Sequence, residues 1–193
     1  MFRSSIPKED VRQLPLIKFE GTIHVLDTPE SFRKAINQLR KENCIGFDTE
    51  TKPTFKKGDY NHTALVQLST MDDAYIFRIH ELGFNGILKD LMEDDGIEKV
   101  GISIRDDLKD LKKMNPFKPA GFIDLNDIAK DLGISQIGMR SLTGIFLESR
   151  ISKSQQTSNW ENEELSAGQQ TYAATDAWVC LKIYQMLEQK GFL

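Results

Sequence analysis

Two kinds of hydrophobic periodicity divide the chain into segments. Short stretches that are continuously apolar, or that alternate apolar with polar residues, are typical of β-strands. Longer stretches repeat their apolar residues every three or four positions, as amphipathic helices do. The predicted strands are residues 21–26, 44–50, 64–69, 74–79, 99–104 and 122–124. The predicted helices are residues 29–39, 81–93, 106–114, 125–132, 139–147 and 165–187.

Local signals at the segment boundaries refine this pattern. Thr28 is a good helix cap and Pro29 suits the first helical position, so a helix is expected to begin there. Residues 71–73 separate two strand segments closely enough to predict a hairpin. Strands and helices alternate after this hairpin. The order is typical of an α/β fold built on a mixed sheet.

The chain of 193 residues is the length of one domain. Pro7 and Pro15 limit any helix near the start, so residues 1–19 are predicted to form an N-terminal arm and residues 20–193 the domain. No apolar run approaches the about 20 residues that span a bilayer. The first ten residues also lack the apolar core of a signal peptide, so we expect a soluble cytoplasmic protein without a membrane partner.

Charge narrows the possible functions. The net charge of -4 argues against nonspecific nucleic-acid binding through a broad basic surface. It does not exclude an enzyme acting on nucleic acid, because a site built from carboxylates adds negative charge that bound divalent metal ions would offset.

The candidate chemistry begins at Asp48 and Glu50, which end an apolar strand segment. Side chains two apart on a strand point to the same face, so the two carboxylates are expected to project together. Such a pair is costly unless a cation or a shared proton lies between them. A strand that simply runs into an acidic turn is the alternative explanation.

Further candidates occur at two other places in the chain. Asp106 and Asp107 lie where a predicted strand gives way to a helix, a position where acidic residues are common for structural reasons alone. Tyr172 and Asp176 are four residues apart in the last predicted helix and therefore share a face. The alanines between them would let another element approach closely.

Taken together, these motifs resemble a known family. The segments Phe47-Asp48-Thr49-Glu50, Ala64-Leu65-Val66-Gln67-Leu68, Ile123-Asp124-Leu125, Ser158-Asn159-Trp160 and Tyr172-Ala173-Ala174-Thr175-Asp176-Ala177 occur in order. With Asp107, they resemble the DEDD superfamily of 3′-5′ exonucleases in the subgroup with a tyrosine in the last motif. Within it, they are similar to ribonuclease D and, more closely, to the Werner-syndrome-type exonuclease domain. The resemblance covers roughly residues 20–190.

The resemblance implies a ribonuclease H-like fold with a mixed five-stranded sheet flanked by helices. It implies hydrolysis of phosphodiester bonds from the 3′ end of a nucleic acid, with release of nucleoside 5′-monophosphates. Asp48 would bridge two divalent ions, Mg²⁺ or Mn²⁺, while Glu50 and Asp176 complete the first metal site and Asp107 supports the second. Asp107 fits the position of the third acid better than Asp106, which stays an alternative.

Other residues are expected to position the substrate. Tyr172 would orient the attacking water, because a phenol is mostly neutral at pH 7. Lys52 and Phe55 are candidates for contact with the terminal nucleotide, Lys153 for contact with a phosphate, and Trp160 for packing beneath the site. A short-oligonucleotide ribonuclease and an inactive nucleic-acid-binding module are the alternative functions. The motifs leave the choice between DNA and RNA open.

Overall fold

The computed structural model describes residues 2–54, 58 and 60–193. Its strands are β1 (Thr22–Leu26), β2 (Cys44–Thr51), β3 (Thr63–Ser69), β4 (Asp73–Arg78), β5 (Glu98–Gly101) and β6 (Phe122–Asp124). Its helices are α1 (Lys8–Gln13), α2 (Pro29–Leu39), α3 (Ile79–Leu82), α4 (Gly86–Met92), α5 (Ile104–Met114), α6 (Leu125–Asp131), α7 (Met139–Leu147) and α8 (Ala167–Gln189). Within the described part of the chain, no helix is long and apolar enough to cross a membrane.

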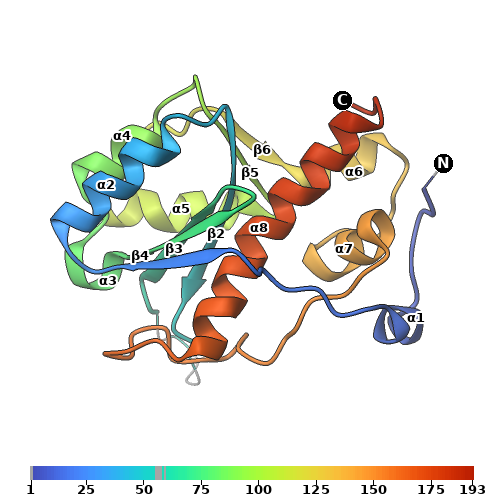
Figure 1. Ribbon diagram of the computed structural model, residues 1–193, viewed down its shortest axis with the longest axis horizontal. Helices are drawn as coiled ribbons and strands as arrows, with labels where there is room; N and C mark the ends of the chain where they lie inside the picture. The colour runs from blue at the N-terminus through green and yellow to red at the C-terminus, as the bar shows by residue number, and fades with distance from the viewer. Residues whose placement is uncertain (1, 55–57, 59) are drawn as a thin grey trace.

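The strands form one mixed sheet in the order β1-β4-β3-β2-β5-β6 (Figure 1). β2, β3 and β4 are antiparallel neighbours, whereas β1 pairs with β4 in parallel, and β5 and β6 continue in parallel beyond β2. The α/β class and ribonuclease H-like architecture are confirmed. The strand count of five is wrong, because the short β6 pairs with β5 over three residues and adds a sixth strand.

Helices cover both faces of the sheet (Figure 1). On one face, α2, α4 and α5 pack against apolar strand residues such as Phe47 and Phe77. On the other, α6, α7 and α8 enclose a second apolar core that includes Val100 and Val179. The functional motifs of β2 and α8 meet on this second face.

The N-terminal arm (residues 1–19) is a packed part of this second core. Ile6, Val11 and Phe19 are almost fully buried in it. The prediction that prolines confine this region to a short helix agrees with α1, which is six residues long. The arm then runs across α8 to β1 (Figure 1).

Two predicted segments differ from the structure for local reasons. The helix expected over residues 81–93 is divided into α3 and α4, because Gly83 adopts a left-handed φ of 72° and Asn85 caps a new helix. The strand expected over residues 99–104 ends at Gly101. Ser103, with a φ of 64°, turns the chain directly into α5.

Candidate active site

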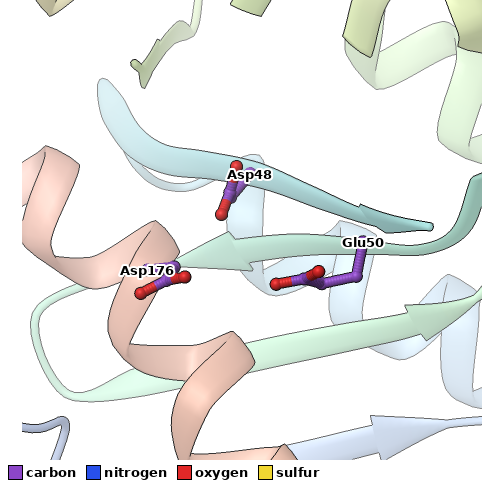
Figure 2. Close-up of side chains that lie close together, drawn as sticks. All are labelled: Asp48, Glu50 and Asp176. Carbon is purple, nitrogen blue, oxygen red and sulfur yellow. The ribbon is translucent and has the colours of Figure 1, made fainter. Parts of the chain in front are cut away.

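Asp48 and Glu50 lie on β2 at the centre of the sheet. Phe47, which precedes Asp48, is fully buried in the core on one face of the sheet. The two acids project from the other face toward α8 (Figure 2). This is the two-residue periodicity that the sequence predicted. The β2–β3 register shifts directly after Glu50, so regular pairing ends where the acids are presented.

The long helix α8 brings Asp176 to the same place. α8 crosses β2 so closely that a Cβ atom at Gly46 would overlap the carbonyl oxygen of Ala177. Only glycine allows this approach, and the small Ala173 and Ala174 are likewise fully buried. As a result, carboxylate oxygens of Asp48, Glu50 and Asp176 all lie within 4.8 Å of one another, and we call these residues the acidic cluster (Figure 2).

Burial makes the acidic cluster electrostatically costly. Desolvation, followed by the charge of Asp176, raises the pKa of Asp48 well above its ordinary value. The same two causes raise the pKa of Glu50 to about 9. Desolvation raises the pKa of Asp176 to about 7, although the neighbouring Tyr172 hydroxyl partly offsets this rise.

These carboxylates fit a divalent metal ion. Asp176 Oδ1 is buried and has no hydrogen-bond partner among the described residues. A buried oxygen without a partner is expensive, and a cation would satisfy it. Because the donors are all carboxylate oxygens, they match hard ions such as Mg²⁺ and Mn²⁺.

The start of α5 places Asp107 beside this cluster. Thr49, between the two acids of β2, donates a hydrogen bond from Oγ1 to Asp107 Oδ1. Burial raises the pKa of Asp107, and its charge in turn contributes to the raised pKa values of Asp48 and Glu50. Asp106 is exposed to solvent. Of the two neighbouring acids, Asp107 is therefore the half-buried one whose charge reaches the acidic cluster, and its carboxylate lies outside the set of oxygens within 4.8 Å of one another.

Asp124 is a supporting residue whose role the sequence analysis missed. Its carboxylate accepts hydrogen bonds from the backbone N–H groups of Ser103 and Ile104, at 3.0 and 3.1 Å. It also caps α6 by accepting from the Asn126 N–H at 2.9 Å. Asp124 thus fixes the turn that leads into α5 and, through it, the direction of Asp107. Its position just before a predicted helix was the available signal.

Tyr172 lies one helical turn before Asp176 and is half-buried. Desolvation, then the charges of Asp176 and Glu50, raise the pKa of its phenol above the ordinary value. The group therefore keeps its proton at neutral pH and can donate a hydrogen bond. Its ring centroid lies 5.8 Å from that of the buried Trp160, so the two rings pack against each other.

The predicted substrate-binding residues have different surroundings. Trp160 is fully buried, so it packs in the core and does not present a surface to substrate. Lys52 Nζ forms an ion pair with Glu161 at 2.9 Å. Lys153 is exposed and lines a cavity with Tyr172 and Asp176. Phe55 lies outside the described residues.

Two cavities flank Tyr172 and Asp176. The first has a volume of about 350 Å³ and the second about 340 Å³. The N-terminal arm supplies part of the wall of each: Lys8 and Val11 line the first, and Leu16 and Lys18 line the second. The residue pattern of the arm gives no signal of where it docks, so its place beside the site was not predicted from the sequence.

Comparison with known proteins agrees with this geometry. A family model described as 3′-5′ exonuclease matches residues 23–191. The chain is 32% identical to the mouse bifunctional 3′-5′ exonuclease/ATP-dependent helicase WRN over 92% of its own length, but it spans only 13% of that protein. It is 31% identical to a 3′-5′ exonuclease of Arabidopsis thaliana, over 92% of this chain and 67% of the relative.

A solved structure shows the same fold. The crystal structure of the Aedes aegypti Nibbler EXO domain superposes with a TM-score of 0.77 at 25% identity, over 87% of this chain and 88% of that one. The family match covers nearly the whole chain, including the strand and the helix that carry the acidic cluster. This chain therefore belongs to the 3′-5′ exonuclease family.

Proposed function

We propose that this protein is a metal-dependent exonuclease that removes nucleotides from the 3′ end of DNA or RNA and releases nucleoside 5′-monophosphates. The observation that carries the proposal is the convergence of Asp48, Glu50 and Asp176 within 4.8 Å, from a strand and a helix far apart in the sequence. Mutually repelling buried acids have no stabilising role of their own. Binding of a metal cation would offset their repulsion, so a metal site explains why the three acids lie together.

The four acids divide between two metal sites in this proposal. Asp48, Glu50 and Asp176 would hold one Mg²⁺ or Mn²⁺ ion, and Asp48 and Asp107 would support a second. When bound, such a pair lowers the pKa of a water molecule and stabilises the attacking and leaving oxygens of a phosphodiester. Thr49 holds the Asp107 carboxylate by a hydrogen bond, and Asp124 fixes the turn before α5, so these two residues keep Asp107 in place near the acidic cluster.

Tyr172 acts on the water molecule that attacks phosphorus. Because its pKa is raised, the phenol stays protonated and works as a hydrogen-bond donor that orients water, rather than as a general base. Trp160 keeps the ring in place from below. Lys153 contacts a phosphate of the substrate from the cavity wall.

Degradation of labelled nucleic acids tests the proposal. The substrates are 5′-labelled single-stranded DNA, recessed duplex DNA and single-stranded RNA, each with Mg²⁺, Mn²⁺ or EDTA. We expect a ladder that shortens from the 3′ end only when metal is present. Asp48→Ala should abolish it, and Asp106→Asn, at an exposed neighbouring acid, should retain it.

The same experiment distinguishes the alternatives. Cleavage of di- to pentanucleotides without shortening of longer strands would indicate a short-oligonucleotide ribonuclease. Metal binding and nucleic-acid binding without cleavage of any substrate would indicate an inactive binding module and would contradict the proposal. The ranking of DNA and RNA among cleaved substrates would identify the preferred nucleic acid.

A further inference from the structure

The N-terminal arm is fastened to the elements that carry the active site. The Phe19 N–H donates to Thr175 Oγ1 at 3.0 Å, directly beside Asp176 on α8. The Ile17 N–H donates to the carbonyl oxygen of Arg150 at 2.9 Å. Nearer the start of the arm, the Ile6 N–H donates to Gln136 Oε1 at 2.7 Å. The three bonds fasten the arm at both ends, and the bond between Ile6 and Gln136 joins two residues that line the first cavity.

Three cationic side chains line that cavity together with Tyr172 and Asp176. They come from separate parts of the chain, and we call them the basic group: Lys8 of the arm, Arg140 of α7 and Lys153 of the segment that follows α7. Among the residues that the structure describes, none of the three forms an ion pair. Within the described part of the chain, these three cations thus share one cavity with Asp176 without forming an ion pair.

Two of these cations lie where positive charge does not stabilise a helix. Lys8 is the first residue of α1 and Arg140 is the second residue of α7. The helix dipole disfavours positive charge in the first turn. At the start of α7 no side chain caps the free backbone N–H groups, and Arg140 Nε is buried without a hydrogen-bond partner in the described chain. These unpaired donors and charges make the cavity wall suited to a negatively charged ligand.

We propose that the basic group binds a backbone phosphate of the nucleic-acid strand upstream of the bond being cleaved, with Lys8 and Arg140 as positioning residues. This inference rests on the proposed exonuclease function. A strand that ends in a 3′-hydroxyl carries no phosphate beyond its end. With the scissile phosphate at the acidic cluster, the phosphate in the neighbouring cavity belongs to the preceding nucleotides. The N-terminal arm is then part of the substrate-binding surface.

Equilibrium binding and kinetics test this assignment separately. Binding of a fluorescent single-stranded 12-mer, measured by anisotropy in EDTA at several salt concentrations, would be compared for wild type, Lys8→Gln, Arg140→Gln and the double variant. Lys34→Gln, at an exposed lysine on α2, removes the same charge away from the cavity. Rates would be measured on the 12-mer and on the p-nitrophenyl ester of thymidine 5′-monophosphate, which has no upstream phosphate.

We expect Lys8→Gln and Arg140→Gln each to weaken binding of the 12-mer about two- to fivefold and to reduce the slope of log Kd against log salt by about one. KM for the 12-mer should rise in parallel, with kcat and the small-ester rate unchanged. Lys34→Gln should behave as wild type.

Two outcomes would overturn the inference. Wild-type affinity and salt slope in the double variant would show that the cations do not contact the strand. An equal loss of rate on the small ester would place their effect at the acidic cluster or in folding, which melting curves would separate. If wild type cleaves neither substrate, the proposed function fails, whereas the binding comparison still decides the phosphate assignment.

Discussion

The acidic cluster and the basic group belong to one site but are built in opposite ways. The acids lie on a central strand and a packed helix, where burial raises their pKa values and small residues enforce close approach. Lys8 and Lys153 are exposed and lie on short or irregular segments. Chemistry at the scissile bond requires fixed ligands. Holding a flexible nucleic-acid strand requires only positive charge at the right distance. Substitutions in the basic group should therefore reduce activity less than substitutions in the acidic cluster.

Replacing Asp176 with asparagine should give the largest effect. The side chain keeps its shape but loses its charge, so the exonuclease rate should fall by about 10²- to 10³-fold, because metal stabilisation is worth several kcal/mol. Without metal, the variant should melt at a higher temperature than wild type, since a buried repelling charge is removed. Gel-based rates and melting curves in EDTA measure both. Full activity in the Asp176→Asn variant would contradict the view that the acidic cluster is less tolerant of substitution than the basic group.

Tyr172→Phe should have the next largest effect. Loss of the phenol hydrogen bond should lower kcat roughly ten- to a hundredfold, while metal affinity stays close to that of wild type. Kinetics and a Mn²⁺ titration by calorimetry compare the two quantities. A matching loss of metal affinity would assign Tyr172 to the metal site and not to the water molecule.

Gly46→Ala tests how tightly α8 must approach β2. The added methyl group meets the Ala177 carbonyl, so we expect about 1–3 kcal/mol of destabilisation in chemical unfolding, together with lower activity as Asp176 moves away. Gly86→Ala is the matched control, because a Cβ there meets open space. Equal stability of the two variants would mean that the helix can shift without cost.

The pH dependence of stability tests the raised pKa values of the acids. A carboxyl group whose pKa is raised by folding favours the folded state at low pH, and this advantage is lost as pH rises through the raised value. The metal-free protein should therefore lose stability between about pH 5 and 9, through the pKa values near 7 for Asp176 and 9 for Glu50. Added Mn²⁺ should restore the stability that the metal-free protein loses over this pH range. Melting temperatures that rise over this range in EDTA would contradict the raised values.

Strand and helix periodicity predicted much of this molecule because the relevant information is local. The pairing of Asp48 with Glu50 follows from strand geometry, and that of Tyr172 with Asp176 follows from helix geometry. The preference for Asp107 over Asp106 was available from the sequence, but the hydrogen bond from Thr49 that holds Asp107 lies between two elements and was not. The pairing of residues 122–124 with β5 and the docking of the arm likewise depend on contacts between distant segments, although the strand at 122–124 was itself predicted. No pattern within one segment contains that information.

The crossing of α8 over β2 has a consequence for when the protein becomes active. Asp48 and Glu50 belong to an early strand and Asp176 to the last helix of the fold, so a partly synthesised chain that ends before α8 has an incomplete acidic cluster. Nuclease activity appears only after α8 has docked. Folding and assembly of the metal site are therefore a single event, because the last ligand arrives with the helix that closes the second core.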